Sequence, residues 1–395
     1  MTKYVIIIPD GAADYPLEHF QGKTAFEAAA IPNIDKISTS GRQGLVKTVP
    51  EKMEPGSDVA QMSLLGYDPR RYYSGRAPIE AAARNIKLSP DDWIFRCNLV
   101  TIVDNKMIDH SAGHITTAEG EKLINELDDQ LGNDNMRFYT GISYRHILVF
   151  KNMDIDVQTY PPHDHIGTSI DKILPRGKGA EMLIDLMARS QQLFANHDIN
   201  RVRKDLGENQ VSSIWLWGQG KKTQMESFEK RYGLKGATIT AVDLVRGLSK
   251  LIGFDLIHVP GATGFIDTNF QGKGTAAIEA LDKYDIVFVH IEAPDEAGHS
   301  GNPEMKKKAI EEIDKHIVGP VLEALQKFDS WRILIMPDHY TPTKSCAHSG
   351  EPVPFAMAGD NISGILQANF NETNAAKSGF RIDNGFELME YFLKS

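Results

Sequence analysis

Short apolar runs that end in a polar or small residue recur along the chain. Runs of about four to eight residues rich in isoleucine and valine are typical of strands buried on both faces of a sheet. These runs predict strands at residues 4–8, 254–259, 284–291, 331–336 and 354–358.

Helical patterns lie between these strands, at residues 24–40, 274–283 and 304–328. The first begins with Thr24-Ala25-Phe26-Glu27, which has the spacing of a capping box. Strands that alternate with helices predict an α/β fold, in which a mostly parallel sheet carries helices on both faces.

The middle of the chain has a different pattern. From about residue 99 to 203, polar strand-like pieces such as 136–150 and 157–159 are separated by Gly, Pro and Asp-Asn turns and by longer helices. We therefore expect a smaller inserted α+β domain, residues 99–203, in a core domain formed by residues 1–98 and 204–395.

Composition narrows the classes of function. The 395 residues suit two domains, and 41% hydrophobic with 24% charged residues fits a water-soluble globular protein. The net charge of -10 argues against a nucleic-acid partner, because phosphate backbones are bound by clustered Lys and Arg. No apolar stretch approaches the roughly 20 residues that span a bilayer. Cys97 and Cys346 are far apart in sequence, which favours a reducing cytoplasm over a disulfide framework.

Metal-binding residue types follow three of the predicted strands. Ligands of an open parallel sheet bind beyond the carboxyl ends of its strands, so these side chains are expected to meet. They are Asp10, Asp295, His299, Asp338, His339 and, within ten residues of the last strand end, His348. Carboxylate oxygens with imidazole nitrogens suit divalent manganese, zinc or iron, whereas calcium prefers oxygen alone.

The spacing of these residues sets conditions on the backbone. Asp295 and His299 are four residues apart, so one helical turn places both on one side, although such a pair alone is more often ordinary helix surface. Asp338 and His339 are adjacent at a strand end, where side chains diverge. Both can reach one metal only if the backbone bends, which Tyr340-Thr341-Pro342 favours.

Ser57 is the candidate nucleophile. Gly56 allows a tight turn before it, and a helix is predicted from Ser57 to about Leu65. Free backbone N–H groups and the helix dipole stabilise a phosphate at such a terminus. The alternative interpretation is that Ser57 is a plain N-cap.

Taken in this order, these residues resemble the alkaline phosphatase superfamily and, within it, the archaeal-type bisphosphoglycerate-independent phosphoglycerate mutases. The resemblance covers nearly the whole chain, including Gly56-Ser57-Asp58-Val59-Ala60, Leu65-Gly66-Tyr67-Asp68-Pro69 and Pro260-Gly261-Ala262-Thr263-Gly264. It implies an alkaline-phosphatase-like three-layer sandwich and a cytoplasmic, glycolytic enzyme. That enzyme interconverts 3-phosphoglycerate and 2-phosphoglycerate through a phosphoserine intermediate on Ser57.

The resemblance also implies a division of ligands between two divalent metal ions, with manganese favoured and zinc or magnesium as alternatives. One ion is held by Asp10, Ser57, Asp338 and His339, and the other by Asp295, His299 and His348. The implied partner is a small phosphorylated metabolite; nucleic acid and membrane are not expected, and the oligomeric state stays open.

One segment departs from the archaeal pattern. Asp109-His110-Ser111-Ala112-Gly113-His114 stands where those mutases tend to carry an arginine-bearing string. With Pro161-Pro162-His163-Asp164, it is more similar to a bacterial subgroup proposed to act as homoserine kinase in threonine biosynthesis. A phosphomonoesterase and an inactive metal-binding scaffold are further alternatives, although all seven ligand positions are filled, which favours an active enzyme.

Several charged residues are candidates for substrate contact. Arginine suits bidentate recognition of carboxylate or phosphate. The candidates are Arg76, His114, Arg145, His163, Asp164, Arg203 and Lys273. Each candidate also has a purely structural interpretation: the arginines can be solvated side chains on a loop, His163-Asp164 can fix a turn, and Lys273 can be a surface lysine. His290, inside a predicted strand, is interpreted as a core histidine.

Overall fold

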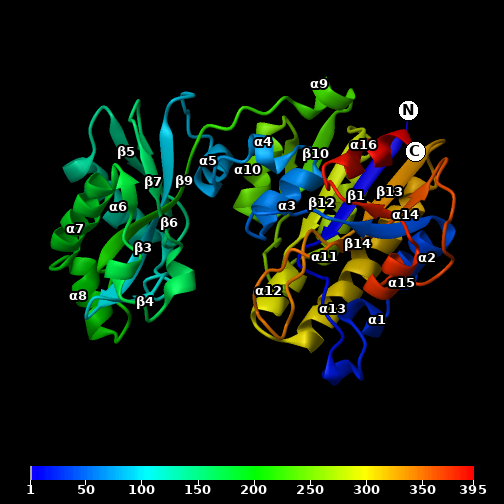
Figure 1. Ribbon diagram of the computed structural model, residues 1–395, viewed down its shortest axis with the longest axis horizontal. Coiled ribbons are helices and arrows are strands. Elements are labelled where there is room, and N and C mark those ends of the chain that lie inside the picture. Colours follow the sequence, from blue (N-terminus) through cyan, green and yellow to red (C-terminus); the bar gives the residue numbers. More distant parts are fainter. Residues whose placement is uncertain (1) are drawn as a thin grey trace. The chain divides into compact units, whose positions relative to one another are not determined.

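The computed structural model describes residues 2–395 (Figure 1). The larger of its two units is built around a twisted sheet in which β1 (Lys3–Pro9) is a central strand. Its eight described strands run in the order β11-β10-β12-β1-β13-β14-β2-β15. The other strands are β2 (Arg42–Val46), β10 (Gly236–Ile239), β11 (Asp255–Ile257), β12 (Ile286–Ile291), β13 (Trp331–Ile335), β14 (Val353–Gly359) and β15 (Arg381–Ile382).

The sheet is mostly parallel, as predicted. β1 pairs in parallel with β12 on one side and with β13 on the other. β14 is antiparallel to both of its neighbours, β13 and β2. All five predicted strands are present, but the apolar pattern of residues 354–358 carried no information on strand direction.

Helices pack on both faces of this sheet, which confirms the layered α/β class. The helices of this unit are α1 (Ala25–Ala28), α2 (Pro32–Ser40), α3 (Ser57–Leu64), α4 (Pro69–Tyr72), α9 (Phe228–Tyr232), α10 (Asp243–Leu251), α11 (Phe270–Ala280), α12 (Ala293–His299), α13 (Pro303–Ile313), α14 (Gly319–Leu325), α15 (Glu372–Lys377) and α16 (Glu387–Lys394). Among the described residues, no helix has both the length and the apolarity to cross a bilayer.

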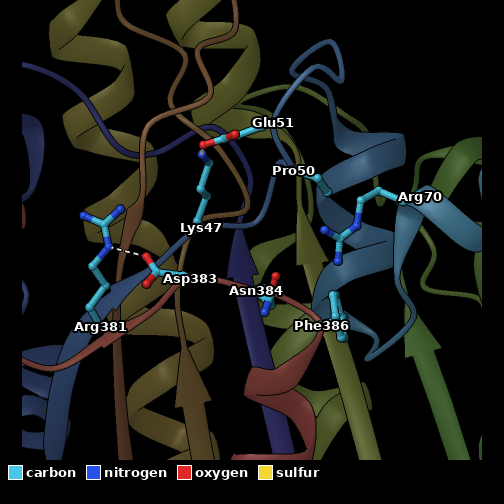
Figure 2. A pocket seen from close by; sticks show the side chains of 9 residues that line it. Lys47, Pro50, Glu51, Arg70, Arg381, Asp383, Asn384 and Phe386 are labelled. Atoms are coloured by element: carbon cyan, nitrogen blue, oxygen red, sulfur yellow. Dashed lines mark hydrogen bonds and ion pairs between the residues drawn. The ribbon is translucent and has the colours of Figure 1, made fainter.

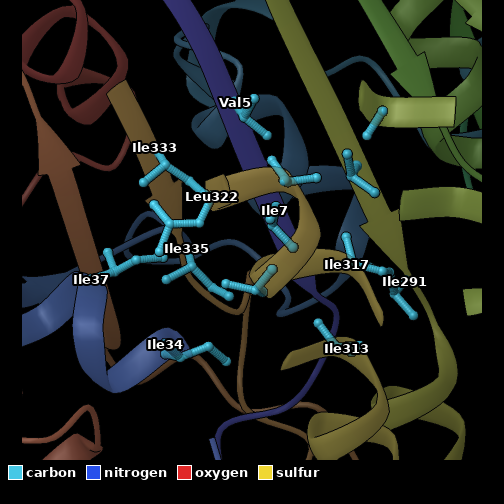
Figure 3. Packing of buried hydrophobic residues seen from close by; sticks show 14 of the residues in the cluster. Val5, Ile7, Ile34, Ile37, Ile291, Ile313, Ile317, Leu322, Ile333 and Ile335 are labelled. Atoms are coloured by element: carbon cyan, nitrogen blue, oxygen red, sulfur yellow. The ribbon is translucent and has the colours of Figure 1, made fainter. Parts of the chain in front are cut away.

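Side chains of β1 alternate between the two faces of the sheet and pack into the hydrophobic core on each side. Val5 and Ile7 are fully buried in one cluster with residues of α2, α11, α13 and α14 (Figure 3). Tyr4 points the other way and packs edge-on against Phe392 of α16, with ring centroids 5.7 Å apart. Successive side chains of a strand face opposite sides of the sheet, so one apolar run serves two layers.

Two predicted helices are interrupted. The helix expected at 24–40 forms as α1 and α2, because Ala29 is extended and Pro32 begins the second helix. The predicted capping box is confirmed, since the Thr24 side chain accepts from the Glu27 N–H. The helix expected at 304–328 consists of α13, a π-helical turn at Asp314–Val318 and α14.

The second compact unit comprises Ser74–Thr223, and the first comprises the chain up to Tyr73 with Gln224–Ser395. Its described elements are α5 (Arg76–Ala83), β3 (Trp93–Val103), β4 (Lys106–Asp109), α6 (Thr117–Leu131), β5 (Met136–Tyr139), β6 (Arg145–Phe150), β7 (Asp156–Gln158), β8 (Arg176–Lys178), α7 (Ala180–Phe194), α8 (Asp198–Asp205) and β9 (Ser213–Lys221). Strands β4, β3, β6 and β5 form an antiparallel sheet, and β9 also pairs with β3.

The limits of this unit differ from the expected 99–203. β3 runs from Trp93 as one strand and pairs with β6 and β9 along its length, so a boundary at 98/99 would cut the sheet. A boundary at 203/204 would likewise cut α8 and leave out β9. Met1, with which the expected core domain begins, lies outside the described residues.

Candidate active site

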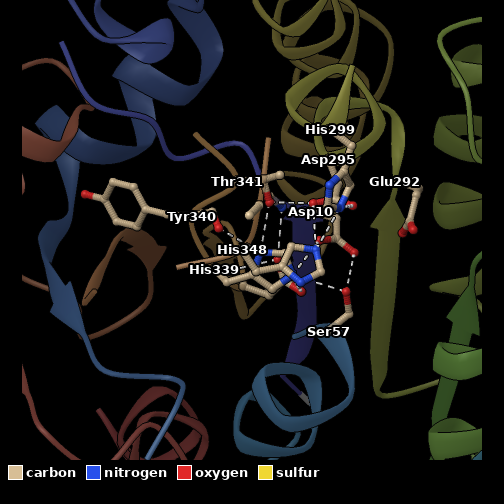
Figure 4. A network of polar contacts seen from close by, with 12 residues as sticks. Asp10, Ser57, Glu292, Asp295, His299, His339, Tyr340, Thr341 and His348 are labelled. Atoms are coloured by element: carbon tan, nitrogen blue, oxygen red, sulfur yellow. Dashed lines mark hydrogen bonds and ion pairs between the residues drawn. The ribbon is translucent and has the colours of Figure 1, made fainter. Parts of the chain in front are cut away.

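Three neighbouring strands, β12, β1 and β13, bring the predicted ligands to one edge of the sheet (Figure 4). Asp10 follows β1 directly. Asp295 and His299 lie on α12, which comes after β12. Asp338 and His339 follow β13. The carboxyl ends of parallel strands meet at one edge, and for this reason segments more than 280 residues apart converge there.

Asp10, Asp338 and His339, here called the inner group, are fully buried, and their ligand atoms all lie within 4.8 Å of one another. His339 Nε2 is 3.4 Å from Asp10 Oδ1 and 3.5 Å from Asp338 Oδ2. The backbone bends after β13, and Asp338 Oδ1 accepts from the N–H groups of Gly11 and His339. Adjacent side chains therefore reach the same point.

Asp295, His299 and His348, here called the outer group, form a second cluster with ligand atoms within 4.8 Å. His299 Nε2 and His348 Nε2 are 2.9 Å apart, and Asp295 lies 3.2 Å from the first and 3.5 Å from the second. His299 Nδ1 is 3.0 Å from the Cys346 carbonyl, which can only accept, so Nδ1 carries the proton. Its Nε2 lone pair then faces the second imidazole, and a proton or metal cation has to lie between them.

The buried carboxylates of the site favour the binding of cations. Burial raises the pKa of Asp10 well above its usual value, with added repulsion from Asp338, Glu292 and Asp295. Burial likewise raises the pKa of Glu292 to about 8. Asp10 Oδ1 and Glu292 Oε2 are buried and have no hydrogen-bond partner among residues 2–395. Buried carboxylates that repel one another, each with one oxygen that lacks a donor, fit divalent cations, and the mixed oxygen and nitrogen donor set suits them.

The pKa values of the histidines shift in opposite directions in the two groups. Burial lowers the pKa of His339. The hydrogen bond with Asp295 raises the pKa of His299 to about 9, against the effect of burial. Burial would raise the pKa of Asp295 itself, yet its hydrogen bonds with His299 and His348 hold it well below the usual value.

Ser57 is the first residue of α3, and Gly56 occupies the N-cap position without a side-chain cap. The interpretation of Ser57 as a plain N-cap is therefore wrong. Its Oγ lies 3.4 Å from Asp10 Oδ2 and 3.2 Å from His339 Nε2, beside the inner group. The nucleophile candidate and the inner ligands thus share one point at the N-terminus of a helix.

Four residues that lie at the site were not predicted as site residues from the sequence. His290, interpreted as a core histidine, is buried but has Nε2 2.7 Å from Asp10 Oδ2 and Nδ1 3.1 Å from Thr240 Oγ1. Gln61, one turn after Ser57, donates to Asp338 Oδ2 at 2.9 Å. The other two are Glu292 and Thr341. A signal existed for Glu292, since it follows β12 as Asp10 follows β1, with Pro9 paired to Ile291.

Lys273 lies near the site rather than on the surface. It is buried in α11, and its Nζ is 3.4 Å from the backbone oxygen of His290. Burial lowers its pKa to about 8. The interpretation of Lys273 as a surface lysine is therefore wrong.

The other substrate candidates belong to the second unit and stay predictions. Arg76 forms an ion pair with Glu80, and Arg145 lies over the ring of Tyr144. Arg203 is buried, and its guanidinium donates to the carboxylates of Glu119 and Glu208 and to the carbonyls of Ala112 and Asn209. His163 lies 3.6 Å from Asp164 and packs edge-on against Trp217, and burial lowers its pKa to about 4. His114 is exposed with a left-handed backbone.

A separate pocket of about 300 Å³ lies in the first unit and contains none of the predicted ligands (Figure 2). Its cations are already paired: Arg381 with Asp383, Lys47 with Glu51, and Arg70 with Asp68. This pairing differs from the site, where Asp10 and Glu292 are buried carboxylates, each with one oxygen that has no hydrogen-bond partner among the described residues.

Comparisons with known proteins agree with one another. A family model described as 2,3-bisphosphoglycerate-independent phosphoglycerate mutase matches residues 38–200. A probable 2,3-bisphosphoglycerate-independent phosphoglycerate mutase of Geobacter sulfurreducens is 47% identical and covers 99% of both chains. The Methanothrix thermoacetophila protein of that name is 48% identical, also over 99% of both. Among solved structures, the PH0037 protein from Pyrococcus horikoshii has a TM-score of 0.84 at 28% identity and covers 99% of this chain and 96% of that one.

Proposed function

Since the chain belongs to the family of 2,3-bisphosphoglycerate-independent phosphoglycerate mutases, we propose that it interconverts 3-phosphoglycerate and 2-phosphoglycerate with Ser57 as the nucleophile. One observation carries the assignment of the nucleophile: Ser57 Oγ lies beside both Asp10 and His339 at the start of α3. The first-turn N–H groups and the helix dipole are suited to hold a phosphoryl group at that position.

Two divalent cations, with manganese favoured over zinc and magnesium, would be held by the residues of the two groups. Asp10, Ser57, Asp338 and His339 would hold one, and Asp295, His299 and His348 the other. When bound, such cations lower the pKa of a serine hydroxyl and offset charge that develops on phosphoryl oxygens.

In the proposed reaction, Ser57 Oγ attacks the phosphorus of bound 3-phosphoglycerate and gives up its proton. The bond from phosphorus to the 3-oxygen of glycerate breaks, and that oxygen takes a proton. The 2-hydroxyl of the same glycerate then attacks the phosphorus of the phosphoserine and gives up its proton, and the Ser57 oxygen leaves and recovers a proton. The sum is an isomerisation, so no phosphoryl donor is consumed.

This reaction belongs to glycolysis, and two free cysteines fit a reducing cytoplasm. The curated relatives described above are named as phosphoglycerate mutases, and nothing in the comparisons favours the homoserine kinase alternative.

The test uses manganese-loaded protein with 3-phosphoglycerate in one reaction and homoserine plus ATP in another. We expect 2-phosphoglycerate in the first and no phosphohomoserine in the second; the reverse result would overturn the assignment. Chelation should abolish turnover and manganese should restore it.

Ser57→Ala should lower kcat by more than about 10⁴-fold and should remove the phosphoserine seen by mass spectrometry of protein quenched during turnover. Ser63→Ala is the matched control, because Ser63 lies on the same helix with its hydroxyl directed to the Thr48 carbonyl. Retained turnover in Ser57→Ala would exclude the phosphoserine route.

A further inference from the structure

The hydroxyl of Thr341 lies between the inner and the outer group (Figure 4). Its Oγ1 is 2.5 Å from Asp295 Oδ1 of the outer group and 3.1 Å from His339 Nδ1 of the inner group. The side chain is fully buried, so water does not compete for these contacts. One hydroxyl therefore touches a predicted ligand of each cation.

The direction of these hydrogen bonds follows from the partners. A carboxylate only accepts, so the single hydroxyl proton of Thr341 is donated to Asp295. The threonine oxygen can then only accept, and His339 Nδ1 has to donate to it. The Tyr340 carbonyl, 3.3 Å from the same nitrogen, also requires a donor there. His339 is thereby held in the tautomer whose Nε2 lone pair faces Ser57 and Asp10.

The backbone of Thr341 is held separately. Lys306 on α13 is fully buried, and its Nζ donates to the Thr341 carbonyl at 2.7 Å, the Ala13 carbonyl at 3.3 Å and the Asp14 carboxylate at 3.3 Å. This ammonium ties the segment after β1 to the segment after β13. Thr341 consequently has little freedom to move away from its two partners.

The molecule also makes room for the hydroxyl. Gly11 has a left-handed backbone, with φ of +58°, and a Cβ there would collide with Asp295 Oδ1 and Thr341 Oγ1. Gly298 on α12 would likewise collide with the Thr341 backbone if it carried a side chain.

We propose that Thr341 is a positioning residue that couples the two ligand groups, by setting the tautomer of His339 and the orientation of Asp295. This inference rests on the proposed two-metal function. It implies that each cation site depends on the other through Thr341. Partners that orient metal ligands in this way typically contribute about 10- to 100-fold to metal affinity.

The first experiment titrates metal-free protein with Mn²⁺ by calorimetry. We expect two sites in the unsubstituted protein, a loss of about 10- to 100-fold in affinity at both sites in Thr341→Val, and near-normal affinity in Thr341→Ser, which keeps the hydroxyl. Thr238→Val is the matched control, because Thr238 is equally buried and its hydroxyl bonds Ser249.

Unchanged affinity in Thr341→Val, a loss at one site only, or a Thr341→Ser protein as weak as Thr341→Val would each overturn the coupling. Failure of the unsubstituted protein to bind Mn²⁺ would instead overturn the two-metal function on which the inference rests. The outcomes therefore separate the two proposals.

The second experiment does not depend on metal or on a folded Thr341→Val protein. Nitrogen-15 NMR of histidine-labelled, metal-free protein should show His339 protonated at Nδ1 in the unsubstituted protein and in Thr341→Ser. A proton on Nε2 of His339 in the unsubstituted protein, with Nδ1 bare, would overturn the assignment.

Discussion

The inner and outer groups use the same residue types in different surroundings. The inner group is fully buried, and Asp338 is held by two backbone N–H groups and by Gln61. In the outer group, the side chains of His299 and His348 are 37% and 26% exposed, and one backbone carbonyl orients His299.

This difference has a chemical consequence. Burial lowers the pKa of His339 and so favours the neutral imidazole that binds a cation, whereas the hydrogen bond with Asp295 raises the pKa of His299 and favours its protonated form. A cation at the outer group has to displace a proton, and it is nearer to solvent. We therefore expect the outer group to exchange its cation more readily than the inner group.

Among the changes that distinguish the two groups, the largest effect should come from removing one carboxylate charge in each group. Asp338→Asn is expected to lower kcat by about 10³-fold or more, because a cation at the inner group, which faces Ser57, supplies several kcal/mol to the transition state. Asp295→Asn should lose the outer Mn²⁺ and keep the inner one. Turnover and bound Mn²⁺ per chain measure both, and two bound ions in each variant would contradict the division into groups.

A smaller effect is expected from Gly11→Ala, which crowds the point where the groups meet. Gly11 and Gly22 both have positive φ, so alanine costs each about 1 kcal/mol of backbone strain, but a Cβ at Gly22 would meet no atom of the described residues within 4 Å. We expect Gly11→Ala to weaken Mn²⁺ at both groups and Gly22→Ala to lower only thermal stability. Equal Mn²⁺ affinity in the two variants would show that close approach at Gly11 is not needed.

The smallest effect concerns pH in the metal-free protein. The pKa of His299 is raised from 6.5 to about 9, so its stabilising contribution is complete below pH 6.5 and disappears as pH rises through 9. Thermal unfolding of the protein and of His299→Gln from about pH 6 to pH 10 should therefore converge at the alkaline end. The apparent Mn²⁺ affinity of the outer group should rise over that interval, because the cation has to displace the proton of His299.

Much of the site could be predicted because its residues follow buried strands. Asp10, Asp295 and Asp338 are visible as polar residues after apolar runs, and the structure brings them to one edge with the histidines and Ser57. Thr341, Gln61 and His290 carried no comparable signal. A hydroxyl, an amide or a strand histidine is common anywhere in a sequence, and its role depends on which atoms lie opposite it.

Apolar periodicity and residue chemistry are local properties, so they predicted five of the eight described strands in the larger unit, the layered α/β class and the candidate cation ligands, but not β2, β10 or β15. The antiparallel direction of β14, the extension of the second unit to Ser74–Thr223 and the bridge from Thr341 to both groups became visible only in the folded molecule. These features depend on pairing between distant segments, which no local pattern encodes.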